Sequence, residues 1–129
     1  MRLRPYEQVD DLPFSATRDE VVQRYGHPLK EERNAVELTE LDYGDHVFRF
    51  QDGGRLEEVT ARAPVLDVGN VAIPFVNLAD FVRRQDPNAF ERAGFLVSPL
   101  LGLAFVPHQP NWVTALARHC LPEWRAIRH

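Results

Sequence analysis

The spacing of apolar residues changes along the chain, and its first regular stretch predicts a short helix after Thr17. Thr17 and Glu20 have the spacing of a capping box, in which each side chain satisfies a free backbone amide at a helix start. Gly26 and Pro28 supply a left-handed cap and a residue that cannot continue the helix. The apolar side of this helix consists of Val21, Val22 and Tyr25.

From Ala35 onward the apolar residues come in short runs with polar residues between them, which is typical of half-buried strands. Gly44-Asp45 and Asp52-Gly53-Gly54 separate the runs, and Asp-Gly between alternating apolar residues is a strong hairpin signal. We therefore predict an antiparallel meander of three strands. Its apolar residues are Val36, Leu38, Leu41, Tyr43, Val47, Phe48, Phe50, Leu56 and Val59.

Beyond the meander, turn residues and caps predict two more hairpins and further helices. Gly69-Asn70 separates the strands of one hairpin, Val65 to Val68 and Val71 to Phe75. The other joins Phe95–Val97 to Leu103–Val106, two runs with almost no polar face.

The helices are predicted from capping residues. Asn77 can cap a second helix, which Asp86-Pro87 would restart and Gly94 would end. Asn111 can cap a last helix through Trp112, Leu116 and Cys120 that ends at Pro122. The chain is thus expected to form a single α+β domain over residues 1–129, with an antiparallel sheet packed against about three helices.

Composition agrees with a globular protein that works in a reducing compartment. The chain is 44% hydrophobic and 26% charged, as ordinary globular domains are. Its longest apolar stretch, Phe95 to Val106, is shorter than the roughly 20 residues that span a bilayer. The N-terminus lacks the apolar run of a secretory signal, and the single cysteine, Cys120, cannot form an internal disulfide. We expect a cytoplasmic protein without a membrane partner.

Charge is concentrated in the meander. Nine acidic and three basic residues lie between Glu31 and Thr60, a local charge of −6 in a chain of net charge −4. Such a block repels phosphate backbones, which disfavours nucleic acid and favours a basic protein partner. The alternative is that these acids form only the solvated outer face of a sheet.

The sequence contains only weak signals for catalytic or metal-binding residues. His119 and Cys120 are adjacent, so their side chains point about 100° apart on a helix, and Cys120 is expected to be a small buried apolar residue. No zinc-binding spacing links the other histidines, which are His27, His46, His108 and His129. We therefore expect no catalytic residue, no metal and no cofactor.

Several runs resemble small bacterial proteins. Leu12 to Val21, Tyr25 to Pro28, Leu41 to Tyr43 and Phe48 to Val59 are similar to the helix-then-meander unit of outer-membrane assembly lipoproteins and β-lactamase inhibitor proteins. With Gly94–Pro99 and Asn111–Thr114, the chain also resembles immunity-type proteins encoded beside bacterial toxins. It departs from the lipoproteins in having no lipidated N-terminal cysteine.

The resemblance implies a non-catalytic protein that neutralises a cognate toxin with a basic surface by occluding its active site or substrate groove. The residues expected to bind the toxin are Asp42, Asp45, Asp52, Glu57, Glu58, His108 and Trp112. Two alternatives stay open. One is a small hydrolase or ligand-binding enzyme that uses His46 or His108 with a carboxylate in a pocket between sheet and helices. The other is an oligomeric structural protein with an apolar patch around Trp112 and Trp124.

Overall fold

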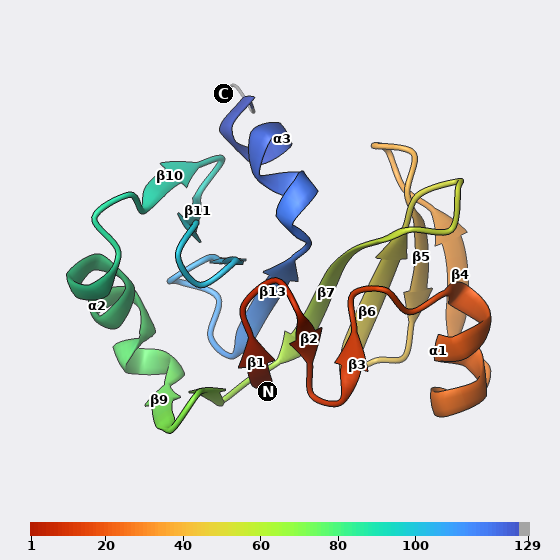
Figure 1. Cartoon of the computed structure of the whole chain (residues 1–129), viewed down its shortest axis with the longest axis horizontal. Helices are drawn as coiled ribbons and strands as arrows, with labels where there is room; N and C mark the ends of the chain where they lie inside the picture. Colours follow the sequence, from red (N-terminus) through yellow and green to blue (C-terminus); the bar gives the residue numbers. More distant parts are fainter. Residues whose placement is uncertain (127–129) are drawn as a thin grey trace.

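The structure is a computed structural model and describes residues 1–126; His129 lies outside this range. It confirms the α+β class, because strands in two mainly antiparallel sheets pack with three α-helices (Figure 1). The helical elements are α1 (Arg18–Tyr25), α2 (Phe75–Gln85), the 3₁₀ turn η1 (Arg118–Cys120) and α3 (Leu121–Ala126).

The larger sheet has eight strands, all antiparallel to their neighbours. In spatial order they are β10 (Phe90–Arg92), β11 (Phe95–Ser98), β12 (Leu103–Phe105), β13 (Trp112–Leu116), β7 (Leu56–Arg62), β6 (His46–Phe50), β5 (Thr39–Asp42) and β4 (Lys30–Arg33).

The smaller sheet has five short strands, and its middle pair, β1 and β8, is parallel. In spatial order they are β3 (Leu12–Pro13), β2 (Gln8–Val9), β1 (Arg2–Arg4), β8 (Val65–Val68) and β9 (Val71–Pro74). Figure 1 shows β1 to β3 and α1 in front of the large sheet, with α3 at the end where the chain finishes.

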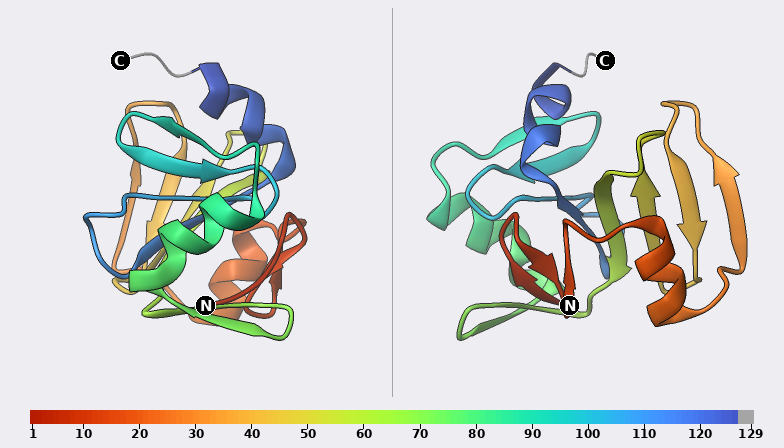
Figure 2. Two further views of the ribbon diagram at one scale, coloured as in Figure 1. Left: turned by 90° about the vertical axis from the view of Figure 1, so that its left-hand side faces the viewer. Right: turned by 45° about the vertical axis from the view of Figure 1, so that its right-hand side comes forward.

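The main core lies between the large sheet on one side and α1, α2 and the small sheet on the other. Leu41, Phe48 and Val59 share one face of the large sheet and are buried with Val21 of α1. In the right-hand view of Figure 2, α1 lies across β5 and β6. We call this the inner face of the sheet, and the face turned away from α1 the outer face.

The predicted first helix and meander are confirmed. Thr17 and Glu20 form both hydrogen bonds of the capping box, and the amide of Gly26 donates to Val22 O at the end of α1. The three predicted strands are β5, β6 and β7, and β8 and β9 form the predicted hairpin. Strand β4 was not predicted, because its four residues are all charged and exposed.

The predicted last helix is wrong. Trp112 to Leu116 forms β13, which pairs with both β7 and β12 in the middle of the large sheet. Both faces of this strand are covered, so its last four residues are buried, and a continuous apolar run does not distinguish a buried strand from a helix. Pro122 lies in the first turn of α3, where a proline is tolerated, and does not end a helix.

The predicted caps of the second helix are also wrong. Helix α2 begins at Phe75, before Asn77, and ends at Gln85. Asp86 does not restart it, because its buried carboxylate accepts hydrogen bonds from the Ser98 hydroxyl at 2.7 Å and the Leu100 amide at 3.0 Å. Phe90, expected in a helix, begins strand β10.

None of the helices described between residues 1 and 126 has the length and apolar character required to cross a bilayer.

Candidate functional site

The outer face of the large sheet carries a row of charged side chains where the inner face carries the core. Strand register places Glu40 of β5 opposite Arg49 of β6, and Arg49 opposite Glu58 of β7. Alternation along each strand explains the row, because the adjacent residues Leu41, Phe48 and Val59 lie on the inner face.

Arg49 links three strands of this face. Its Nε donates to Glu40 Oε2 at 2.8 Å, its Nη1 donates to the Thr60 hydroxyl at 2.6 Å, and Nη1 lies 3.5 Å from Glu58 Oε1. Thr60 in turn shares a 2.8 Å hydrogen bond with Thr114 of β13. The side chains of Arg49, Glu40 and Glu58 are only 21%, 23% and 17% exposed, so the row is largely withdrawn from water.

Glu40 and Glu58 experience different environments although they share Arg49. Burial raises the pKa of the Glu58 carboxyl, and the charge of Arg49 and a 3.1 Å hydrogen bond from Trp124 Nε1 only partly oppose this. Burial also acts upward on the pKa of Glu40, but hydrogen bonds from Arg49 and Asn34 outweigh it and lower that pKa. Desolvation therefore dominates at Glu58 and hydrogen bonding dominates at Glu40.

Two cavities open on this face, and both are lined by Arg49. One, of about 340 Å³, also contacts Thr60, Thr114, Gln109, Phe95 and Trp112. The other, of about 440 Å³, lies between the β4–β5 turn and α3 and contacts Val36, Leu38, Glu58, Glu123 and Trp124. We call these two cavities together the outer groove.

The predicted partner-binding residues are only partly brought together. Glu58 and Trp112 line the outer groove, and Trp112 is 36% exposed. Asp45 and His108 are exposed, Asp42 is half-buried in β5, and Asp52 is exposed in an ion pair with Arg33. Glu57, expected on the surface, is 1% exposed. The five predicted acids therefore do not form one continuous acidic surface.

Glu57 is buried because of an irregularity in the sheet. The register between β6 and β7 shifts at Arg49 and Phe50, so Phe50 pairs with Leu56, Arg49 pairs with Glu58, and Glu57 has no partner on β6. Such bulges redirect a side chain. Here Glu57 contacts the 3₁₀ turn η1, where His119 Nε2 bonds to its Oε2 and Cys120 Sγ lies 2.8 Å from the same oxygen.

This cluster of Glu57, His119 and Cys120 has the atoms of a metal site and lacks the properties of a thiol nucleophile. One ligand atom from each residue lies within 4.8 Å of the others. Burial strongly raises the pKa of the Cys120 thiol, and its hydrogen bond to the Glu57 carboxylate raises it further. A reactive cysteine requires the opposite shift toward thiolate. His119 and Cys120 need not face one another to form the cluster, because both reach the carboxylate of Glu57.

The histidines of the enzyme alternative lie in other places. His46 packs in an aromatic cluster with Tyr25, Tyr43 and Phe48, and its buried Nε2 has no hydrogen-bond partner among residues 1–126. The hollow beside it, which Asp10 also lines, measures about 40 Å³. That volume suits about one water molecule and is too small for an organic substrate.

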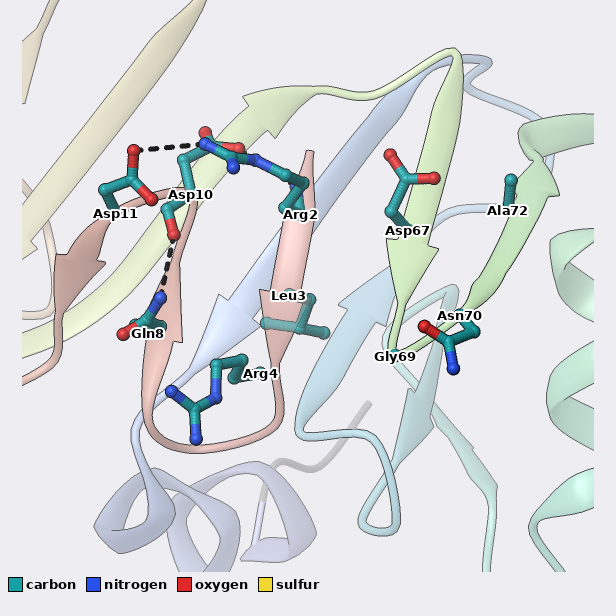
Figure 3. A pocket seen from close by; sticks show the side chains of 10 residues that line it. All are labelled: Arg2, Leu3, Arg4, Gln8, Asp10, Asp11, Asp67, Gly69, Asn70 and Ala72. Atoms are coloured by element: carbon teal, nitrogen blue, oxygen red, sulfur yellow. Dashed lines mark hydrogen bonds and ion pairs between the residues drawn. The ribbon is translucent and has the colours of Figure 1, made fainter.

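The most voluminous of the described cavities, about 600 Å³, lies on the small sheet (Figure 3). Its charged side chains come from β1, β8 and the turn after β2, and they largely satisfy one another. Arg2 forms a 3.1 Å ion pair with Asp11, and its amide donates to Asp10 Oδ1 at 2.9 Å. The wide spacing of Arg4, Asp67 and Asn70 in Figure 3 provides no convergent set of groups for chemistry.

The chain was compared with protein-family models, with curated proteins and with solved structures, and none of the three comparisons found a match. The outer groove is therefore the candidate functional site on geometry alone. Sequence reasoning proposed Glu58 and Trp112 for partner binding and placed Trp124 in a candidate apolar patch, but it missed Arg49. The alternation of Arg49 and Thr60 with apolar neighbours was the available signal for this face.

Proposed function

We propose that the protein is a non-catalytic binding protein of the inhibitor or immunity type, which receives a basic segment of a partner protein in the outer groove. One observation carries the proposal. A largely buried Glu40–Arg49–Glu58 row runs along a groove that has one tryptophan in each of its two cavities. Tryptophan and arginine side chains, which line both cavities, are enriched at protein–protein interfaces.

Charge favours a basic occupant. Three carboxylates, those of Glu40, Glu58 and Glu123, lie in or beside the groove with one guanidinium, that of Arg49. The excess is negative, and burial raises the pKa of Glu58 because its charge is poorly solvated. A lysine or arginine side chain that enters the groove would compensate that charge.

The tryptophans provide the apolar part of the contact. Trp112 is 36% exposed at the end of β13, and Trp124 packs edge-on against Phe95 with 5.1 Å between ring centroids. Rigid aromatic side chains near the centre of an interface contribute much of the binding energy. A cation beside an indole ring gains a further attraction from the ring electrons.

Occlusion is the mechanism that this geometry supports. A toxin loop or active-site rim rich in lysine or arginine would be held in the groove and withheld from its substrate. Electrostatic attraction between the acidic groove and a basic toxin would also accelerate association. Such a partner is the one expected from the charge of the meander, but its contact surface is now the sheet face and not the exposed turns.

The two tryptophans make the proposal testable, because the chain has no others and both line the groove. The chain is co-expressed with the product of the neighbouring gene, and the purified pair is titrated by calorimetry and by tryptophan fluorescence. We expect binding to change the emission. Trp112→Phe and Trp124→Phe variants assign the change to each cavity.

Matched carboxylate variants then test the position of the interface. Glu58→Gln is expected to weaken binding at least about tenfold, as loss of a central charged contact does. Glu7→Gln, an exposed glutamate in the β1–β2 turn, serves as the control and should bind as the parent chain does. Binding that leaves the fluorescence of both tryptophans unchanged would contradict the proposal. An equal loss of affinity in Glu58→Gln and Glu7→Gln would contradict it as well.

A further inference from the structure

A second site lies at the beginning of β7, beside the outer groove but independent of the function proposed for it. The three side chains that meet there offer one oxygen, one nitrogen and one sulfur, from Glu57, His119 and Cys120, with all three ligand atoms within 4.8 Å of one another. Sulfur and imidazole ligands with a carboxylate select a borderline-soft cation such as zinc over magnesium or calcium.

Burial holds most of this cluster in a fixed position in the folded chain. Glu57 and Cys120 are buried, and the side chain of His119 is 30% exposed. Two ligands are therefore buried in the protein, and the third is partly exposed to solvent. A tetrahedral zinc ion with three protein ligands takes a water molecule as its fourth ligand.

Charge balance also favours a cation. The Glu57 carboxylate is removed from water, and besides its hydrogen bond with His119 its contact with a cationic side chain is a 3.3 Å approach to Oε1 by Arg55, which is 54% exposed. Buried charges in proteins are paired or coordinate metals. A divalent ion bound by one carboxylate, one thiolate and one neutral imidazole makes a site of zero net charge.

We propose that Glu57, His119 and Cys120 bind one Zn²⁺ ion. When the Zn–S bond forms, the Cys120 thiol releases its proton to solvent, and His119 coordinates through the unprotonated Nε2. No electron transfer takes place, because Zn²⁺ is redox-inert. Arg55, bonded to the other Glu57 oxygen, would orient the carboxylate from outside the ligand shell.

The ion would connect the large sheet to the C-terminal helical segment. Glu57 belongs to β7, whereas His119 and Cys120 belong to η1, which leads directly into α3. Helix α3 has only six residues, and an isolated helix of that length is unstable in water. Zinc would therefore hold α3 on the sheet, with Trp124 against Glu58.

Cobalt provides the direct test. The chain, purified without a histidine tag and stripped with a chelator, is titrated with Co²⁺ and followed by absorption spectroscopy. We expect one Co²⁺ per chain, a near-ultraviolet thiolate-to-cobalt band, and visible bands of tetrahedral intensity. Zn²⁺ should displace the cobalt and abolish both sets of bands, and it should raise the melting temperature of the parent chain.

Three variants separate the site from adventitious binding. Cys120→Ser should remove the charge-transfer band, and His119→Gln should lower Zn²⁺ affinity about a hundredfold in competition with a chelating dye. His27→Gln, an exposed histidine after α1, is the matched control and should retain parent affinity.

The zinc proposal stays testable even if the Cys120→Ser variant does not fold, because the parent chain and His119→Gln each provide a separate measurement. The side chain of His119 is partly exposed, so His119→Gln is expected to keep the fold, which circular dichroism checks. A parent chain without the thiolate band, or equal Zn²⁺ affinity in His119→Gln and the parent, would show that the cluster is only a hydrogen-bonded network.

Discussion

The two faces of strands β5 to β7 are built from alternate residues of the same segments, yet they bury different chemistry. On the inner face Leu41, Phe48 and Val59 are at most 2% exposed and pack under α1. On the outer face the neighbouring residues Glu40, Arg49 and Glu58 are also largely covered, but they form ion pairs. Apolar burial stabilises the fold directly, whereas a buried ion pair gains little because desolvation offsets its attraction.

The residues of the inner face therefore stabilise the fold, whereas the charged residues of the outer face are available for recognition of a partner. Replacing a buried ion pair with apolar residues of similar volume is often neutral or stabilising in other proteins. The outer row is therefore expected to contribute less net stability than apolar residues of the same volume would, and its charges are suited to binding a charged partner. Substitutions on the two faces should have effects that differ in size and in the property they change.

The largest expected effect is on the inner face. Phe48 contacts Tyr25, Tyr43 and His46, with ring centroids 5.2 to 5.7 Å apart. Phe48→Ala should lower the free energy of unfolding by about 3–5 kcal/mol, because it leaves a cavity in the core. Urea denaturation measures the loss. Val47→Ala, the adjacent residue on the outer face, is the control and should cost about 1 kcal/mol or less; equal losses would contradict the distinction between the faces.

A smaller loss of stability is expected at Arg49. Arg49→Ala leaves Glu40 and Glu58 without their shared cation, and breaking a fully buried pair costs about 3–5 kcal/mol. Since the row keeps some contact with water, we expect about 2 kcal/mol. The double variant with Glu58→Gln should recover part of the loss in a double-mutant cycle by urea denaturation. Strict additivity would show that Arg49 and Glu58 are not coupled.

The pH dependence should identify Glu40 as the stabilising acid of the row. Its pKa is lowered below the usual 4.5, so its contribution is present above that pH and is lost as the pH falls through the lowered value. Glu40→Gln should be less stable than the parent at pH 7, and the difference should shrink below about pH 4.5. Arg49, Asn34, Lys30 and the facing Glu32 remain in both chains. A difference that is constant from pH 7 to pH 3 would contradict this assignment.

Trp112 should affect binding more than folding. It is 36% exposed, so Trp112→Ala should lower the free energy of unfolding by about 1 kcal/mol or less. If the groove binds the partner, the same change should reduce affinity by about 2 kcal/mol, as central aromatic contacts do. Urea denaturation measures the loss of stability of this variant, and calorimetry measures its loss of affinity, so that the two free-energy changes can be compared. A large folding loss with unchanged affinity would assign Trp112 to the core.

Local signals predicted some elements well. The Thr17–Glu20 capping box and the glycine-containing turns of the meander act within a few residues, so the helix and hairpins they specify formed as predicted. Trp112 to Leu116 carried an equally regular apolar pattern, but its strand conformation depends on pairing with β7, about 50 residues earlier in the chain.

The site was harder to predict because it depends on register. Glu57 and Glu58 are adjacent acids in the sequence, and the bulge at Arg49 and Phe50 leaves Glu57 without a partner on β6. One then faces His119 and Cys120, and the other faces Arg49 and Trp124. Hydrophobic periodicity sets which face a residue occupies, but the position of a bulge is not encoded in that period.

The smallest effect is expected at Asp52, although the charge of the meander made it a candidate for partner binding. Asp52 lies in the β6–β7 turn, and both side chains of its ion pair with Arg33 are exposed to solvent, where ion pairs contribute little. Asp52→Asn should leave the urea midpoint and the partner affinity unchanged, whereas Glu58→Gln should weaken binding. Calorimetry of both variants at equal ionic strength compares them. If Asp52→Asn weakened binding as much as Glu58→Gln, the interface would have to include the exposed turn, and the outer groove alone would not explain recognition.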